Sequence, residues 1–340
     1  MDQLLVSMRP DSAGRLPQFD KQASRDLYSW LLEEPLKGIR AGTRVVVIPD
    51  SDLARIPLEV LSPAEGEFVG DRYPVVYSPS AGVLRYQRRS KEGERETVLP
   101  RRALLVGDPV YRGGDGDGPT VADMRDESPR SKALRAYSLD RGLGMFRRLR
   151  WTEHEVRQAA AALEAEGVSV NVLVNEAANE QQVKRMDLGA YRYIHFATHG
   201  ILGGDVPYLK QPALVLSQSH ELGGEDGFLT MSEVLGLRLH AEVTVLSACQ
   251  TGLGREVPGE GVLGLARAFL YAGSRSVVAS LWQVDDESTA MLMEGFYKSL
   301  LGGARVSDAM RVARSWLRAE PGGRWEHPFY WAPFVAFGPE

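Results

Sequence analysis

The chain has 340 residues, of which 44% are hydrophobic and 25% are charged, so it can bury one large core or two smaller ones. Its formal net charge of −5 argues against a nucleic-acid backbone as the main ligand. A single cysteine excludes an internal disulfide. The sequence has no basic, apolar leader and no apolar run near the ~18 residues of a membrane span, which predicts a soluble, cytoplasmic protein without membrane contact.

Short apolar runs rich in Val, Ile and Leu predict the strands. In chain order they occupy residues 44–49, 74–79, 103–108, 169–174, 193–198, 242–248 and 276–282. Their apolarity is continuous rather than alternating, which is typical of strands buried on both faces, as in parallel sheets.

Helical patterns separate several of these strands, at residues 152–167, 259–273, 286–303 and 306–320. In the first, Thr152 is the predicted N-cap and Glu155 completes a capping box. Gly273 is predicted to end the second helix, and Asp286 or Ser288 to begin the third. The alternation predicts an α/β fold in which a mostly parallel sheet carries helices on both faces.

The chain divides into regions of different character. Residues 1–99 carry fewer strands and no candidate chemistry, and we interpret them as an N-terminal subdomain that extends the sheet of a catalytic domain at 100–340. Residues 109–142 are rich in Gly, Asp, Arg and Ser, which predicts a long, exposed, flexible loop. Residues 203–227 form a second region rich in loops.

A histidine and a cysteine, which could act as general base and nucleophile, each follow one of two successive apolar runs. His199 and Gly200 come after residues 193–198, and Cys249 comes after residues 242–248. In open parallel sheets, functional groups gather beyond the carboxyl ends of the strands. An imidazole there can accept the thiol proton and later protonate a leaving amine. Attack of the thiolate on a carbonyl carbon would produce a tetrahedral oxyanion. The backbone N–H groups of Gly200 and Cys249 are predicted to bind it.

The spacing supports this interpretation. His199 precedes Cys249 by 50 residues (249 − 199), close to the spacing between the caspase histidine and its cysteine. The string SACQTG at 247–252 shares the alanine and glutamine of the caspase pattern Q-A-C-[RQG]-G. Serine replaces its first glutamine and the glycine comes one residue late, which indicates a caspase-like group rather than a true caspase.

Ordered blocks along nearly the whole chain resemble the CHAT domain family, the caspase-like clan CD peptidases related to separases. The most specific blocks are YIHFATHG, EVTVLSACQTGLG, GEGVLGLARAFLYAGSRSVVASLWQVDDESTAMLMEGFY and HPFYWAPFVAFG. The resemblance implies a caspase-hemoglobinase fold, with His199 as general base and acid and Cys249 as nucleophile. It also implies protein substrates, such as gasdermin-like pore formers or other effectors in bacterial defence or cell death, and a regulatory sensor or TPR-type partner.

Other motifs point to simpler roles. His195 is predicted to be a buried histidine with a hydrogen-bonding neighbour, and the paired cysteines of a structural zinc site are absent. GGDGDG at 113–118 lacks the remaining ligands of a calcium loop, and the glycines at 259–268 lack the P-loop Lys-Ser/Thr. We therefore expect no metal and no cofactor.

Substrate-contacting candidates follow the strand at 276–282. Asp285 and Asp286 suit a basic substrate side chain, although an acidic residue here also caps the next helix. Trp282 suits a pocket wall and the core about equally. The predicted function is a cysteine endopeptidase that works through an acyl-enzyme, and the competing interpretation is a catalytically silent module that binds protein partners.

Overall fold

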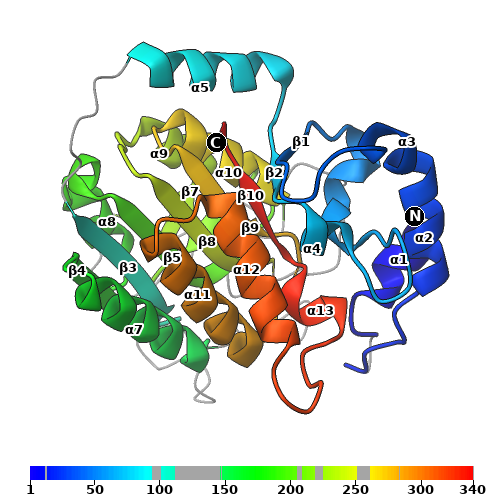
Figure 1. Ribbon diagram of the computed structural model, residues 1–340. Helices are drawn as coiled ribbons and strands as arrows, with labels where there is room; N and C mark the ends of the chain where they lie inside the picture. Colours follow the sequence, from blue (N-terminus) through cyan, green and yellow to red (C-terminus); the bar gives the residue numbers. More distant parts are fainter. Residues whose placement is uncertain are drawn as a thin grey trace.

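The computed structural model describes residues 1–11, 14–93, 101–111, 146, 148–204, 209–218, 225–250, 261–282 and 284–339. These residues form a ten-stranded, mostly parallel sheet with helices on both faces (Figure 1). The predicted fold class is therefore confirmed. Most of the predicted flexible loop, residues 112–142, lies outside the described residues.

The strands coincide with all seven predicted runs and add three short ones. In chain order they are β1 Val45–Val47, β2 Val75–Tyr77, β3 Arg102–Pro109, β4 Ser169–Asn175, β5 Tyr193–Ile201, β6 Ala213–Val215, β7 Phe228–Thr230, β8 Val243–Gln250, β9 Ser276–Ser280 and β10 Phe334–Phe337. Their order across the sheet is β1-β2-β10-β9-β8-β5-β3-β4, and β6 pairs with the end of β5 and with β7. The strands β6, β7 and β10, each of three or four residues, were not predicted, whereas β1 and β2 are as short but lie within the longer apolar runs at 44–49 and 74–79.

The sheet reverses direction at β10. This strand is antiparallel to β9 but parallel to β2, whereas β9, β8, β5, β3 and β4 are all parallel neighbours. The carboxyl ends of these five strands therefore meet at one edge of the sheet, which we call the carboxyl edge. The carboxyl ends of β1 and β2 lie at the opposite edge.

Helices cover both faces of the sheet. The α-helices are α1 Asp2–Ser7, α2 Lys21–Leu31, α3 Glu33–Leu36, α4 Val69–Arg72, α5 Ala81–Gly93, α7 Arg150–Ala165, α8 Glu180–Arg185, α9 Met231–Gly236, α10 Gly261–Tyr271, α11 Asp286–Leu301, α12 Val306–Arg318 and α13 Pro328–Trp331, with short 3-10 turns at Ser51–Arg55, Leu58–Val60 and Leu188–Ala190. Helices α7, α11 and α12 lie in front of the sheet in Figure 1, and α8, α9 and α10 lie behind it. Successive residues of β5 reach the two layers in turn: His195 stacks on Tyr297 of α11, and Phe196 packs against Phe269 of α10.

The predicted capping box at Thr152 is wrong. Helix α7 begins at Arg150, and the Thr152 hydroxyl donates to the Leu149 carbonyl and accepts the N–H of Asp108 in β3. Glu155 is buried in the core and is not available to a helix end. Both side chains connect α7 to the sheet, which is a tertiary role that local patterning does not reveal.

Gly273 ends α10 as predicted. Its φ of +115° is a conformation that side-chain-bearing residues rarely adopt. The N–H of Ser274 bonds the Phe269 carbonyl and the N–H of Gly273 bonds the Leu270 carbonyl, which is the Schellman arrangement. The chain then turns directly into β9.

The N-terminal region joins the sheet through β1 and β2 and shares a continuous hydrophobic core with the rest (Figure 1). Glu59 is fully buried, accepting hydrogen bonds from the Tyr77 hydroxyl at 2.6 Å and from Arg314 of α12 at 2.8 Å. Burial, together with the charge of Glu59, raises the pKa of Tyr77 well above its usual value. This buried ionic cluster connects the first and last parts of the chain.

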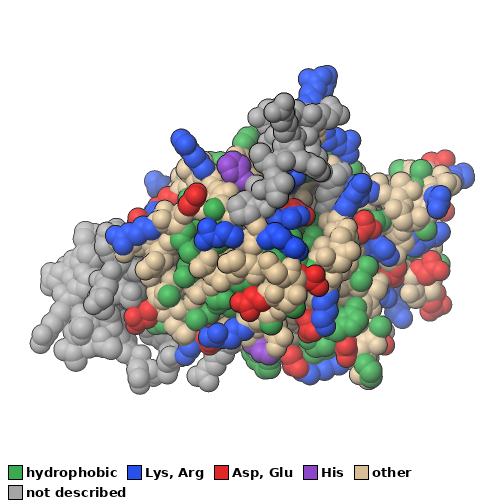
Figure 2. Space-filling view, turned by 60° about the vertical axis from the view of Figure 1, so that its left-hand side comes forward, with side chains coloured by type: hydrophobic (Ala, Val, Ile, Leu, Met, Phe, Trp, Pro, Cys, Tyr) green, Lys and Arg blue, Asp and Glu red, His purple; other side chains and the backbone are tan. Residues whose placement is uncertain are grey.

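The surface is mixed in charge. On the face that Figure 2 shows, the Lys/Arg and Asp/Glu side chains of described residues are interspersed, and neither sign covers a large area. Within the described part of the chain, the helices are all too short or too polar to cross a bilayer.

Candidate active site

The register of β5 and β8 brings the two predicted catalytic positions together. Pairing runs in parallel from Tyr193 with Val243 to Gly200 with Gln250, and it sets His199 directly opposite Cys249. Neighbouring strands lie about 4.8 Å apart, so the 50-residue gap in sequence closes to one strand spacing at the carboxyl edge. The side chain of Cys249 lies outside the described residues.

The imidazole of His199 is surrounded by aromatic rings and is only 4% exposed. Its ring centre lies 5.0 Å from that of Tyr111 and 5.5 Å from that of Phe146. The Tyr111 hydroxyl accepts the His199 N–H at 3.4 Å and lies 2.9 Å from the Thr198 hydroxyl, which in turn donates to the Val215 carbonyl. This chain of hydrogen bonds fixes Tyr111 against the end of β5.

These rings belong to a small hydrophobic cluster that is separate from the main core. We call it the edge cluster; it contains Tyr111, Ile201, Leu209, Ala213, Val215 and Phe228. Phe146 packs against it from outside and is half-buried. The cluster lies where β5 leaves β3 and pairs instead with β6.

Arg148 anchors the chain beside Phe146. Its guanidinium binds both carboxylate oxygens of Asp108, with its shortest contact at 2.6 Å, and the side-chain oxygen of Asn175 at 2.7 Å. Asp108 and Asn175 lie at the carboxyl ends of β3 and β4 with φ of +44° and +53°, a left-handed backbone that Asp and Asn adopt more readily than other residues with side chains.

The sequence pattern that defines the CHAT domain matches residues 21–339. The chain belongs to the CHAT domain family. It is 24% identical to human tetratricopeptide repeat protein 28 over 98% of its own length, and 38% identical to the mouse protein of the same name over 32%. These matches cover only 14% and 4% of those two much longer relatives.

Solved structures with a similar arrangement include two clan CD peptidases. The Saccharomyces cerevisiae separase in its complex with securin matches 87% of this CHAT domain and 16% of its own chain, at 15% identity and a TM-score of 0.46. The Arg-specific cysteine proteinase gingipain R matches 94% of the domain and 66% of its own chain, at 14% identity and a TM-score of 0.47.

The second histidine of the motif has a structural position in this CHAT domain. His195 is fully buried, with Nε2 2.9 Å from Glu155 of α7 and Nδ1 3.1 Å from the Tyr297 hydroxyl of α11. Burial and the charge of Glu155 raise the pKa of Tyr297 well above its usual value. The prediction that His195 is a buried histidine with a hydrogen-bonding neighbour is confirmed, and Tyr297 is that neighbour.

Gly200, the predicted oxyanion donor, lies inside the sheet. It pairs with Gln250 of β8 on one side and with Leu214 of β6 on the other. Strand N–H groups lie in the plane of the sheet, so that of Gly200 points toward one of these neighbours. It becomes available to a substrate oxyanion only where that pairing opens.

The predicted substrate-contacting residues follow β9 at the carboxyl edge. Trp282 is 3% exposed and the Arg9 guanidinium lies 5.7 Å from its ring centre, which places it in the core. Asp285, not Asp286 or Ser288, is the N-cap of α11, because its carboxylate accepts the Ser288 N–H at 2.9 Å. The side chain of Asp286 lies outside the described residues.

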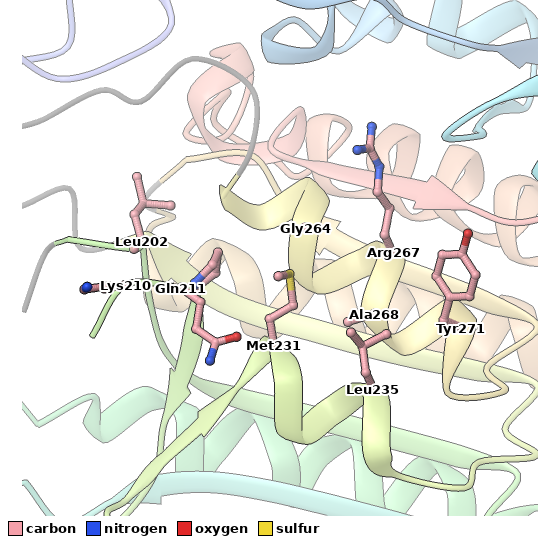
Figure 3. A pocket seen from close by; sticks show the side chains of 11 residues that line it. Leu202, Lys210, Gln211, Met231, Leu235, Gly264, Arg267, Ala268 and Tyr271 are labelled. Atoms are coloured by element: carbon pink, nitrogen blue, oxygen red, sulfur yellow. The ribbon is translucent and has the colours of Figure 1, made fainter. Parts of the chain in front are cut away.

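A depression of about 460 Å³ opens between α9 and α10 (Figure 3). Met231 and Leu235 of α9 and Gly264 and Ala268 of α10 line it, together with Leu202 just beyond β5. Neither His199 nor Gly200 is among the described residues that line this depression.

Sequence reasoning missed an ionic cluster that connects α8 with α9. The ammonium of Lys184 lies 2.6 Å from Glu180, 2.8 Å from Glu225 and 2.7 Å from Glu233. Burial raises the pKa of Glu180 to about 7, whereas hydrogen bonds to the three carboxylates raise that of Lys184 despite its own burial. The three carboxylates lie close enough together to bind a metal ion, but Lys184 already provides their cation.

Sequence reasoning also missed the aromatic surround of His199. Tyr111 falls in the segment predicted to be an exposed loop, yet β3 extends to Pro109 and Tyr111 is 4% exposed. Phe146 and Arg148 follow that segment without any periodic pattern. The only available signal for Tyr111 was its position two residues after the last residue of the extended strand, in the string DPVY at 108–111.

Proposed function

We propose that this CHAT domain is a cysteine endopeptidase in which Cys249 is the nucleophile and His199 the general base and acid. The pairing of these two residues in the register of β5 and β8 is the observation that carries the proposal. Residues paired in register share one face of a sheet, which supports a dyad formed by these two residues.

The proposed reaction proceeds through a thioester. The imidazole takes the proton from Sγ, and the thiolate attacks the scissile carbonyl carbon to form a tetrahedral oxyanion. The protonated imidazole then gives its proton to the leaving amine as the C–N bond breaks, and water activated by the neutral imidazole hydrolyses the thioester. The backbone N–H groups of Cys249 and Gly200 are the candidate oxyanion donors, the latter once its strand pairing opens.

The proposed substrate is a protein, and the proposed partner is a regulatory protein. We place a protein substrate in extended form along the carboxyl edge, with Asp285 and Asp286 as candidate contacts, whereas Trp282 supports this edge from the core. An effector such as a gasdermin-like protein, in cytoplasmic bacterial defence or programmed cell death, suits such a peptidase. The repeat-containing name of the two mammalian relatives supports a regulatory partner of TPR type. Residues 1–99 serve in this proposal as a non-catalytic subdomain.

One observation favours a second function, a silent module that binds protein partners. The His199 imidazole is 4% exposed beneath Tyr111 and Phe146, so a substrate does not reach it in this conformation. The same burial suits either a permanently silent site or a closed form of an active one.

The reactivity of the thiol separates the two functions. Cys249 is the single cysteine, so iodoacetamide gives one adduct whose rate can be followed against pH by mass spectrometry. A catalytic dyad gives an apparent thiol pKa well below the usual value of about 8.5. An ordinary or raised apparent pKa, in the wild type and after the closed form has been opened, supports the silent module.

Cleavage itself provides the decisive test. Proteome-wide profiling of new N-termini should show sites with the wild type that disappear with Cys249→Ala. Ser247→Ala, two residues back on the same strand and buried, is the matched control and should retain them. Cleavage that persists in Cys249→Ala would remove Cys249 from the mechanism.

A further inference from the structure

The geometry points to the edge cluster as a binding subsite for an apolar side chain of the substrate, which Phe146 of the chain itself occupies in this structure. The inference rests on the proposed function, because it places the subsite beside the catalytic imidazole. It adds the chemical class of the side chain that binds there and the way in which the site is closed.

The contacts of Phe146 define the subsite. Its ring centre lies 5.8 Å from that of Tyr111, 5.5 Å from that of His199 and 6.3 Å from that of Phe228, in tilted and edge-on orientations that aromatic pairs prefer. A side chain that touches the imidazole and two aromatic rings fills the space where a substrate residue next to the scissile bond must lie. Phe146 therefore blocks the site rather than completing it.

The chemistry of the surround selects an apolar occupant. The described residues of the edge cluster present carbon surfaces apart from the Tyr111 hydroxyl, which is already bonded to Thr198. Arg148 and Asp108, at the end of β3 and beside Phe146, are paired with each other. Among the described residues a charged side chain would therefore lose its hydration there without gaining a counter-charge, whereas an aromatic or large aliphatic one would be buried favourably.

The position of the cluster suits a ligand site. It is separate from the main hydrophobic core and lies at the carboxyl edge, where ligands bind in open α/β sheets. Phe146 is only half-buried and packs against the cluster from outside. Its withdrawal exposes a hollow beside the imidazole and leaves the sheet and its helices intact.

The contact that keeps Phe146 in place is small and reversible. Arg148 is held by Asp108 and Asn175, and about a third of its side chain, 32%, is exposed to solvent. A substrate that displaces Phe146, or a partner that draws Arg148 away, opens the subsite.

The test follows the accessibility of His199 with diethyl pyrocarbonate, and reads each histidine from its own peptide by mass spectrometry. In the Cys249→Ala background, His199 should be protected as strongly as His195, while the exposed His240 reacts. Phe146→Ala should raise the rate at His199 about tenfold or more and leave His195 protected. Trp151→Ala, which removes an exposed aromatic ring on α7, should leave His199 unchanged.

The class of the occupant is tested in the Phe146→Ala variant. N-acetyl-phenylalaninamide should restore the protection of His199 in a saturable manner, and N-acetyl-argininamide and N-acetyl-glutaminamide at equal concentration should not. Equal protection by all three, or by none, would overturn the apolar subsite. Rapid modification of His199 in the parent protein would overturn the closed state.

A second variant guards against misfolding. If Phe146→Ala unfolds the protein, His195 becomes reactive as well. In that case Arg148→Gln is used instead, because it keeps the Phe146 side chain and weakens only the contacts that anchor the chain beside it. His199 should become reactive in Arg148→Gln while His195 stays protected, and continued protection of both would contradict the role of the anchor. These readings do not depend on Cys249, so the subsite and the proposed peptidase activity can fail separately.

Discussion

Two histidines on β5, four residues apart and both almost fully buried, have opposite surroundings. His195 lies in the middle of the sheet, where Glu155 and Tyr297 bind its two ring nitrogens. His199 lies at the carboxyl edge, where its ring faces Tyr111 and Phe146. Burial alone therefore does not distinguish a structural histidine from a proposed catalytic one. The two differ in the groups that cover the imidazole, which are polar partners at His195 and aromatic rings, one of them proposed to be displaceable, at His199.

The difference also appears in the elements that provide each cover. Glu155 and Tyr297 come from α7 and α11, long helices that pack against each other and against the sheet. Phe146 is half-buried and packs against the edge cluster from outside, and its neighbour Arg148 is held by Asp108 and Asn175. A half-buried ring opens at lower cost than side chains held between packed helices, so we expect the covers of the two histidines to differ in stability as well as in chemistry.

Replacement of His199 should have the largest effect, and it should change the reactivity of the Cys249 thiol. In His199→Ala the apparent pKa of the Cys249 thiol should return to about 8.5, because no imidazole stabilises the thiolate. Peptide cleavage should fall by roughly 10²- to 10⁴-fold, the usual contribution of a general acid–base. An unchanged pH–rate profile of alkylation would show that the imidazole does not interact with the thiol.

Replacement of His195 should fall on stability instead. His195→Ala leaves Glu155 buried without its ring partner, which should lower the free energy of unfolding by about 3–5 kcal/mol in urea titrations. The double variant His195→Leu, Glu155→Leu should recover much of the loss, because it removes the buried charge together with its partner. A loss below about 1 kcal/mol in the single variant would contradict the structural assignment.

Glu180 is a buried acid whose replacement should have a smaller effect, on the pH dependence of the free energy of unfolding. Its folded pKa of about 7 exceeds its ordinary 4.5, so the folded state binds the proton more tightly than the unfolded one. The stabilising contribution is therefore complete below about pH 4.5 and is lost as the pH rises through 7, by about 3 kcal/mol. Glu180→Gln should flatten this part of the stability–pH curve, and an unchanged slope would assign the titration to another group.

Much of the fold was accessible from the sequence because its signals are local. The seven predicted strands are continuous apolar runs, and the two predicted catalytic positions directly follow two of them, so the rule for parallel sheets predicts both at one edge. Gly273 was equally accessible, since a left-handed helix end requires little beyond glycine.

The remainder depends on contacts between distant parts of the chain. Arg148 meets Asp108 across 40 residues, and Arg314 meets Glu59 across 255, without any pattern that announces either pair. The capping box at Thr152 was misassigned for the same reason, because Glu155 is used by a histidine on another element. The ring that covers His199 comes from Phe146, which no periodic pattern singles out.

The reversal of the sheet at β10 affects how the protein is synthesised. In the order of the strands, β1 and β2 connect to the rest only through β10, with Phe337 pairing to Tyr77 across 260 residues (337 − 77). On the ribosome, these two strands must wait unpaired at their inner edge while every other strand emerges. The part of the sheet around β5 and β8 can assemble before that, but the complete sheet closes only after β10 has left the exit tunnel.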